Sequence, residues 1–243
     1  MQLYYKATYY LILILFSSSL YAAPIWQSNQ IFLLHGTGYE VNPDKQSTLT
    51  LEHASGWSIG DVFAFVDFNK YHKKDSENDY YGELSPRLSF NKIANRDINV
   101  GPISDILLAS TIEFGEGDVD SLLLGIGVDL KLPGFNFFNL NFYRRFINSD
   151  RDGETIQITP AWSVNFSKNL SFEGYIDWNI NSDDTYEQNF HFNPRLKYNL
   201  PVFSDMIAVG FEYSYWKNKY GIKNSSAFKT DQEAISLFLS LNF

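Results

Sequence analysis

Aromatic and charged side chains recur at alternate positions along several stretches of this chain. Phe63, Phe65 and Asp67 are spaced by two residues, and Tyr81 and Glu83 repeat that spacing. Aromatic faces can stack against a flat solute, and carboxylate, guanidinium and imidazole groups can hydrogen-bond to its polar atoms. The same groups could instead form structural ion pairs and fill a narrow interior. The full set of candidate residues is Tyr39, Phe63, Phe65, Asp67, Tyr81, Glu83, Arg87, Tyr143, Arg145, Tyr175, Asp177, His191, Arg195, Glu212 and Trp216.

Sequence patterns typical of catalysis or metal binding are absent. The chain has no H-E-x-x-H spacing and no glycine-rich phosphate loop. It also has no cysteine, which excludes thiol chemistry and a disulfide framework. We therefore expect no catalytic residue, no metal ion and no cofactor, and we do not expect an enzyme.

The elements that must position the candidate residues are clearest at the end of the chain. Residues 234–243 read A-I-S-L-F-L-S-L-N-F, with an apolar residue at every second position on one face. A period of two indicates a β-strand. An apolar strand at an open sheet edge would promote aggregation of a soluble protein, whereas in a membrane it can close a barrel.

Alternating segments of about ten residues recur along the chain, and about twelve of them can be recognised. A soluble β-sandwich also alternates, but here nearly every strand has a second face rich in charged and amide groups. We predict an all-β fold, a transmembrane antiparallel up-and-down β-barrel of about 12 strands. The facing of the first segment is ambiguous, because both of its faces contain apolar residues. The expected segments are 28–39, 47–54, 61–69, 80–91, 103–114, 121–130, 138–145, 155–166, 170–178, 189–199, 207–216 and 234–243.

The first 22 residues have the pattern of a secretory signal peptide. A single cation, Lys6, precedes the apolar run 9–16, and small residues follow up to Ala22. The apolar run is too short for a transmembrane helix, which needs about 20 residues. We expect two parts, a signal peptide over 1–22 and an outer-membrane β-barrel over 23–243.

Composition agrees with an exported barrel and argues against nucleic-acid binding. Aromatic residues make up 17% of the chain, as aromatic girdles at two membrane interfaces require. The formal net charge is −9, and it becomes −10 once Lys6 is removed with the signal peptide. Nucleic-acid affinity depends on basic patches, so we expect no such partner.

The connections between the expected strands alternate in length and charge. Every other connection, beginning with 40–46 and ending with 217–231, is long and charged, while 131–134 and 167–169 are short. Outer-membrane barrels have short periplasmic turns and longer external loops. The pattern therefore places the charged loops outside and both termini in the periplasm, although the long connection 92–102 does not fit it.

One stretch resembles a known family. Residues 83–92 read E-L-S-P-R-L-S-F-N-K, and N-V-G-P follows at 99–102. This order of an acidic residue, a Pro-Arg pair, a serine, a lysine and a later Gly-Pro resembles the nucleoside-specific channel family of the outer membrane, Tsx and OmpK. After Pro102 the chain reads I-S-D-I-L, where the family usually has an aromatic residue, and this departure concerns fine selectivity.

The resemblance implies a channel for passive, substrate-selective diffusion of nucleosides through the outer membrane of a Gram-negative cell. It also implies that Tyr39 matches an aromatic residue near the outer end of the family's first strand that contacts nucleoside. Outer-membrane lipid is then a second partner, and phages or toxins could bind the external loops. We expect a monomer.

Two other classes of function remain open. A non-selective small-solute porin or a receptor barrel would share the fold, although a wide pore would contain few inward aromatic residues. An outer-membrane lipid hydrolase would place a histidine and a serine facing the bilayer at the outer rim. Only His53 clearly shares an outward face, with Leu49, and it is expected near the periplasmic side. A membrane-facing triad is therefore disfavoured.

Overall fold

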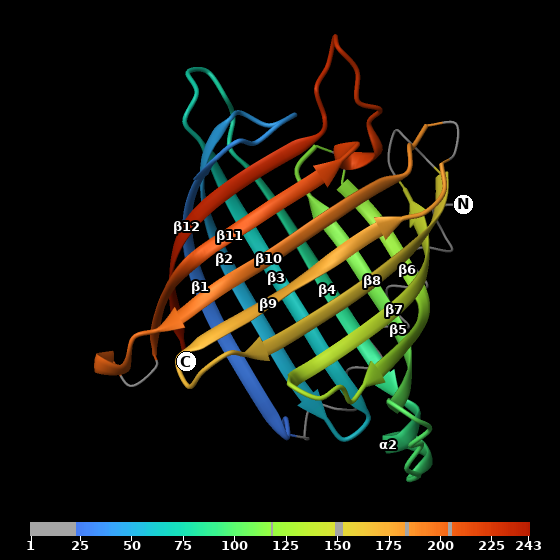
Figure 1. Cartoon of the computed structure of the whole chain (residues 1–243). Coiled ribbons are helices and arrows are strands. Elements are labelled where there is room, and N and C mark those ends of the chain that lie inside the picture. Colours follow the sequence, from blue (N-terminus) through green and yellow to red (C-terminus); the bar gives the residue numbers. More distant parts are fainter. Residues whose placement is uncertain (1–22, 118, 149–152, 183–184, 204–205) are drawn as a thin grey trace.

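The computed structural model describes residues 23–117, 119–148, 153–182, 185–203 and 206–243, so the predicted signal peptide lies outside the described residues. Within these residues, twelve antiparallel strands pair in sequence order and close into a barrel (Figure 1). The predicted fold is confirmed. The strands are β1 Trp26–Thr37, β2 Lys45–Trp57, β3 Gly60–Tyr71, β4 Asp79–Ser89, β5 Ile103–Gly115, β6 Val119–Leu130, β7 Phe135–Ile147, β8 Gly153–Asn165, β9 Leu170–Asn179, β10 Asn189–Asn199, β11 Ile207–Lys217 and β12 Gln232–Asn242.

The apolar faces of the strands point away from the barrel axis. In β12, buried and exposed residues alternate along the whole strand. Leu237 is 71% exposed, while Phe238, the next residue, is 4% exposed. A continuous exposed apolar surface of this kind suits contact with lipid, because each strand of the closed sheet pairs its backbone with a neighbour on both sides.

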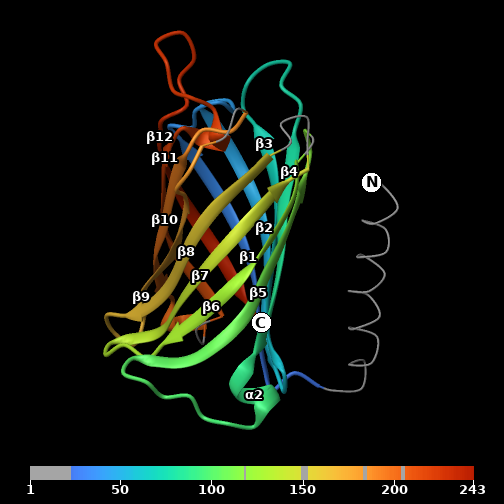
Figure 2. The ribbon, with the colours of Figure 1, turned by 90° about the vertical axis from the view of Figure 1, so that its right-hand side faces the viewer.

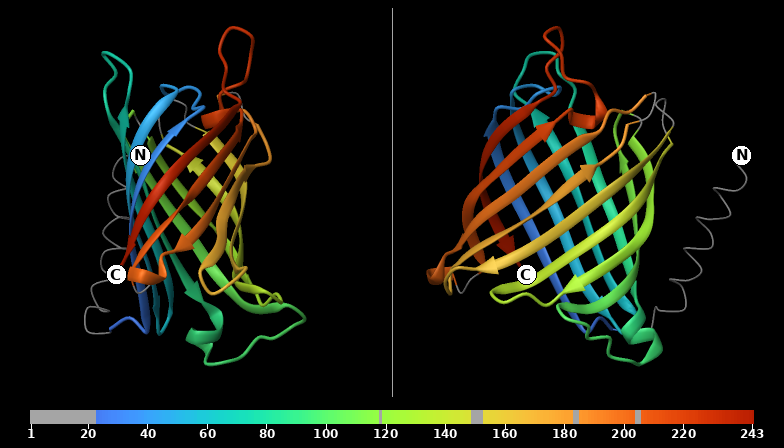
Figure 3. Two further views of the ribbon diagram at one scale, coloured as in Figure 1. Left: turned by 60° about the vertical axis from the view of Figure 1, so that its left-hand side comes forward. Right: turned by 45° about the vertical axis from the view of Figure 1, so that its right-hand side comes forward.

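The ambiguous first strand is settled by its pairing with the last one. Leu33 pairs with Leu239 on the outward face, and Leu34 pairs with Phe238 on the inward face. Inside, the rings of Phe32 and Phe238 meet edge to face with centroids 5.4 Å apart. β1 and β12, far apart in sequence, thus lie side by side and close the barrel, as Figure 3 shows on the left, where β1 is blue and β12 is red.

Two strands end two residues earlier than the alternation predicts. β1 ends at Thr37 rather than at residue 39, because Gly38 adopts a positive φ of 92° and its amide donates to Asp44. β4 ends at Ser89 rather than at residue 91. Ser89 Oγ accepts from the Lys92 amide and caps a short helix, α2 (Phe90–Ala94). Phe90 and Asn91 are therefore helical, and the long connection after β4 protrudes from the barrel with α2 in it (Figure 2).

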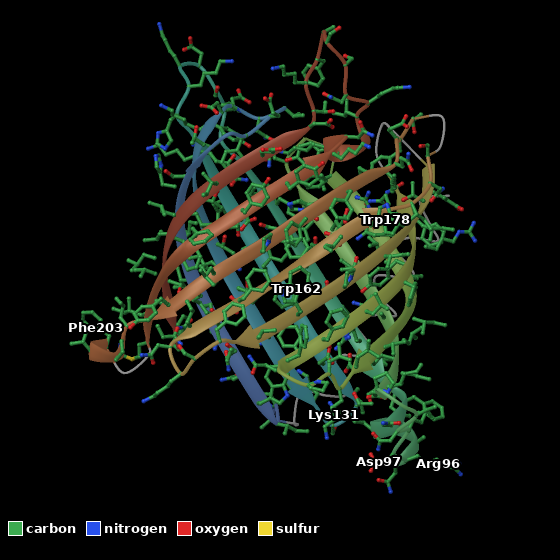
Figure 4. All side chains as sticks on the ribbon, in the orientation of Figure 1. Arg96, Asp97, Lys131, Trp162, Trp178 and Phe203 are labelled. Carbon is green, nitrogen blue, oxygen red and sulfur yellow. The ribbon has the colours of Figure 1, made fainter. Side chains whose placement is uncertain are left out.

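The barrel has two unlike ends. One end, which we call the long-loop end, carries the connections β1–β2, β3–β4 and β11–β12, and the last of these contains the short 3-10 helix η2 (Lys219–Gly221). The opposite, termini end holds both chain ends of the barrel, α2, and the helix η1 (Pro201–Phe203). Arg96, Asp97 and Lys131 lie at the termini end (Figure 4). No helix among the described residues is long and apolar enough to cross a membrane.

Candidate functional site

The interior of the barrel gathers the predicted charged and aromatic residues into neighbouring rows. Cross-strand partners share a face of a sheet, so the pairs Asp67 with Tyr81 and His191 with Trp216 point inward together. The strand register, which joins residues far apart in sequence, thus determines which groups meet in the lumen.

A first aromatic wall (Phe63, Phe65 and Tyr81) lies on β3 and β4. The ring centroids of Phe63 and Phe65 are 6.0 Å apart, and those of Phe65 and Tyr81 are 5.8 Å apart. Phe63 is on the inward face and yet 37% exposed, so the space beside it is open to solvent. An accessible ring on an inward face is a surface on which a solute can stack.

A second aromatic wall (Tyr175, His191, Trp216 and Tyr220) runs across β9, β10, β11 and η2. The His191 and Trp216 rings are stacked with centroids 3.9 Å apart. Tyr175 meets His191 at 5.3 Å, and Tyr220 meets Trp216 at 5.6 Å. In the ring of twelve strands β9 is six strands from β3, so the two walls face each other across the lumen.

Three inward arginines are held by carboxylates. Arg87 on β4 donates from Nε and Nη2 to both oxygens of Asp61 at 2.8 Å, and from Nη1 to Asp129 at 2.9 Å. Fork-like pairing of this kind fixes the guanidinium plane. Because its side chain is buried and fully engaged, Arg87 joins β3, β4 and β6.

Arg195 on β10 spans the lumen side of several strands. Its Nε donates to Glu212 at 2.7 Å, and its Nη1 donates to Glu52 on β2 at 3.1 Å. The guanidinium carbon lies 4.5 Å from the centroid of the Phe32 ring beneath it. This single side chain thereby connects β10 and β11 with β1 and β2.

Arg145 on β7 forms the third such centre. It pairs with Glu113 on β5, and its Nη1 donates to the Tyr186 hydroxyl at 2.6 Å. Tyr186 comes from the β9–β10 connection at the long-loop end. The pair therefore ties that connection to the inner wall.

Three of the predicted inward carboxylates lack an ion partner among the described residues: Asp67, Glu83 and Asp177. Asp67 accepts from the Thr50 hydroxyl at 2.5 Å, and Glu83 accepts from the Tyr81 hydroxyl at 2.6 Å. Asp177 accepts from Gln157 at 2.9 Å and from Thr159 at 2.7 Å. A carboxylate has about four acceptor sites, so each of these groups keeps capacity for a hydrogen-bond donor from a solute.

The mouth of the lumen at the long-loop end is narrowed by Tyr39 and Lys219. The Tyr39 hydroxyl lies 2.6 Å from Ser236 Oγ. Lys219 Nζ donates to Gln232 Oε1 at 2.6 Å and lies 5.8 Å and 4.9 Å from the ring centroids of Tyr39 and Tyr220. Burial lowers the pKa of Lys219 to about 7 and raises the pKa of Tyr39 to about 12.

The structure places the predicted site residues unevenly. The residues of the two aromatic walls, together with Asp67, Glu83 and Asp177, line the lumen. Tyr143, in contrast, is 4% exposed and packs against Ala109 and Leu123. The four predicted residues Arg87, Arg145, Arg195 and Glu212 are engaged in ion pairs.

Sequence reasoning missed several residues of the lumen. Glu52, Asp61, Glu113 and Asp129 hold the arginines. These residues occupy inward positions in the alternation of their strands, so the sequence pattern could have indicated them. Tyr220, like its neighbour Lys219, lies in an aperiodic loop, and no alternation could have indicated it. No group of three or more histidines, aspartates or glutamates in the described part of the chain is arranged to hold a metal ion.

Comparison with known proteins places the chain in a family. The sequence profile described as "Nucleoside-specific channel-forming protein, Tsx" matches residues 26–243. The chain belongs to this family. Two relatives named "Outer membrane protein OmpK" support the assignment. The protein from Vibrio parahaemolyticus is 27% identical over 186 residues, covering 72% of this chain and 70% of the relative. The one from strain RIMD 2210633, serotype O3:K6, is 27% identical over 200 residues, covering 75% and 74%.

Solved structures show the same fold at low sequence identity. The KdgM porin superposes with a TM-score of 0.54 at 9% identity, covering 88% of this chain and 99% of the porin. Outer membrane phospholipase A from Escherichia coli also gives 0.54 at 9% identity, covering 91% and 98%. These likenesses concern the barrel alone, since one fold supports unrelated functions. The family match makes this Tsx-family chain an outer-membrane channel protein.

Proposed function

We propose that this channel passes nucleosides across the outer membrane by passive diffusion. The description of its family supports the proposal. Because outer-membrane barrels have short periplasmic turns and longer external loops, we assign the long-loop end to the outside. A monomer, and phage or toxin binding at the external loops, stay predictions.

One observation carries the proposal: the two aromatic walls face each other, and each has a carboxylate without an ion partner beside it. Glu83 lies next to Tyr81 in the first wall. Asp177 is the cross-strand neighbour of His191 in the second. A nucleoside is neutral, with a flat base and a sugar that carries hydroxyl groups. Its base can stack on a ring while a sugar hydroxyl donates to a carboxylate.

The expected binding is weak, as transport requires. Stacking of a base on an aromatic side chain contributes about 1–3 kcal/mol. Conduction needs a site that attracts a solute without retaining it. Selectivity should therefore be greatest at low solute concentration, where weak binding raises occupancy of the lumen.

Uptake in a porin-deficient host tests the proposal. At sub-micromolar concentration, cells carrying the wild-type protein should accumulate uridine and adenosine much faster than a neutral disaccharide. Tyr39→Ala should slow nucleoside uptake, because it removes a ring at the mouth. Equal passage of disaccharide and nucleoside would identify a general small-solute pore instead.

A further inference from the structure

A polar cluster lies on the outward face of the barrel, outside the lumen. His35 on β1 is the cross-strand neighbour of Ser47 on β2, and His35 Nδ1 lies 2.9 Å from Ser47 Oγ. The same hydroxyl oxygen lies 2.8 Å from Nε2 of His72, the residue that follows β3. The two imidazole rings meet edge to face, with centroids 5.2 Å apart. We call these three residues the rim cluster.

Four lysines surround the rim cluster. Lys70 is the cross-strand neighbour of its serine, and Lys45 lies one row closer to the loops. Lys73 and Lys74 follow directly after the second histidine, and all four lysines are exposed. None of them takes part in an ion pair among the described residues. In a chain of net charge −9, this is a local concentration of positive charge.

Three acidic residues lie near this patch, and none of them forms an ion pair with its lysines among the described residues. Asp44 is already hydrogen-bonded, since it accepts from the Thr37 hydroxyl at 3.1 Å and from the Gly38 amide at 2.9 Å. Asp75 and Glu77 lie farther along the β3–β4 loop and are exposed. The ammonium groups that are free of ion pairs thus come from two positions on strands, Lys45 and Lys70, and from two at the start of the β3–β4 connection, Lys73 and Lys74.

An apolar groove adjoins the rim cluster on the membrane side. It has a volume of about 550 Å³, and its apolar lining includes Leu33, Leu49, Phe68, Leu237 and Leu239. His35, Ser47 and Lys70 also line the groove. Because His35 is two residues from the end of β1 and Lys70 is one residue from the end of β3, the polar side of the groove lies at the edge of the apolar belt.

We propose that this surface of β1, β2, β3 and β12 binds a lipid of the outer leaflet whose headgroup carries a net negative charge on its phosphate groups. Ammonium and imidazole groups at the rim match phosphate oxygens, and charge-assisted hydrogen bonds of this type are the strong ones. The groove beneath accommodates an acyl chain. A lipid has this order of groups along the membrane normal, whereas a free phosphate would use only the rim. The proposal does not depend on which solute the lumen passes.

Binding rather than hydrolysis follows from the environment of Ser47. Its hydroxyl can donate its single proton to only one of the two imidazoles and accepts a hydrogen bond from the other, and its backbone lies between paired strands on both sides. Acyl transfer needs free donors directed at the developing oxyanion. Amide groups engaged in a sheet ladder cannot supply them.

Native mass spectrometry of the detergent-solubilised mature protein tests the proposal. The probes are lipid A with two phosphates, the same glycolipid after phosphate removal, and phosphatidylethanolamine. The test variant is Lys45→Gln/Lys70→Gln/His72→Gln. The matched control is Lys131→Gln/Lys168→Gln, which removes two exposed lysines far from the rim cluster, Lys131 at the termini end (Figure 4) and Lys168 in the β8–β9 connection.

The wild type and the control should bind phosphorylated lipid A equally and prefer it to both other lipids. The triple variant should bind it at least about 10-fold more weakly, since each cation near a membrane surface contributes severalfold. Lys70→Gln alone, an exposed change expected to leave the barrel intact, should weaken binding about threefold. Equal affinity of the variants and the wild type, or equal binding of the dephosphorylated lipid, would overturn the proposal.

Discussion

The lumen contains two kinds of charge that behave differently. Arg87, Arg145 and Arg195 are each held by one or two carboxylates from other strands. Glu83 and Asp177, in contrast, meet only neutral donors among the described residues. The arginine centres connect strands, whereas the carboxylates without ion partners retain acceptor capacity toward the lumen.

The arginine ion pairs stabilise the barrel, whereas the carboxylates without ion partners serve the proposed transport. A buried ion pair is costly to break, because removal of one partner leaves the other charge unpaired. A carboxylate that accepts only from hydroxyl or amide groups can exchange those partners for a solute. We therefore expect changes at the arginines to affect folding and changes at the free carboxylates to affect transport.

The largest effect is expected from Arg195→Met. The change leaves Glu52 and Glu212 without their cation, at a cost of about 3–5 kcal/mol. The heat-modifiable migration of the folded barrel in detergent gels should be lost at a clearly lower temperature. The matched control is Arg144→Met, whose ion pair with Glu154 is exposed and should contribute at most about 1 kcal/mol. Equal destabilisation by both changes would remove the distinction between structural and exposed ion pairs.

A smaller effect, on transport alone, is expected from Glu83→Gln. The glutamine keeps the shape of the side chain and its contact with Tyr81. The solute, however, loses its hydrogen bond to a charged carboxylate, and such a bond contributes about 1.5–3 kcal/mol. Uptake of uridine at sub-micromolar concentration should fall severalfold, while the melting temperature of the barrel should not change. Glu116→Gln, at an exposed loop position, serves as control. A drop in thermal stability comparable to that of Arg195→Met would place Glu83 with the structural charges.

The smallest effect concerns Lys219, a buried cation whose pKa is lowered to about 7 from 10.5. Between these pH values the unfolded chain binds more protons, so docking of η2 gains stability as the pH rises from 7 and is weakest below 7. A nitroxide at Lys223→Cys, in a chain without other cysteines, should become more mobile at pH 6 than at pH 8. In Lys219→Met the mobility should not depend on pH. Identical pH dependence with and without the lysine would rule out its titration as the cause.

The fold could be predicted from the sequence because alternation is a local property. In the last strand Leu237, Leu239 and Leu241 alternate with Ser236 and Ser240, which indicates the side that faces outward. The predicted segments recover all twelve strands of the described chain. β1 could not be oriented this way, because Phe32 and Leu33 are both apolar. Only its pairing with β12 decides the question. The end of β4 was missed because Ser89 caps a helix, a local competition that alternation does not reveal.

The site could be predicted only in part, because ion partners are not local. Arg195 and Glu52 are 143 positions apart and meet only when the barrel closes. The alternation along the strand therefore predicts that Arg195 faces the lumen, but it does not show whether the side chain has an ion partner. Lys219 and Tyr220 reach the mouth through a loop without periodicity. The outward facing of His35 likewise depended on the register of β1.

Conductance of single channels in a planar bilayer tests the central claim most directly. The claim is that the first aromatic wall and its free carboxylate hold a nucleoside within the lumen. Uridine or adenosine should reduce the current reversibly and saturably, while an equal concentration of a neutral disaccharide should not. In Phe65→Leu, which removes the ring between Phe63 and Tyr81, about fivefold or more nucleoside should be needed, given about 1–3 kcal/mol per stacked base. Equal block by the disaccharide, or no block by either nucleoside, would contradict the account.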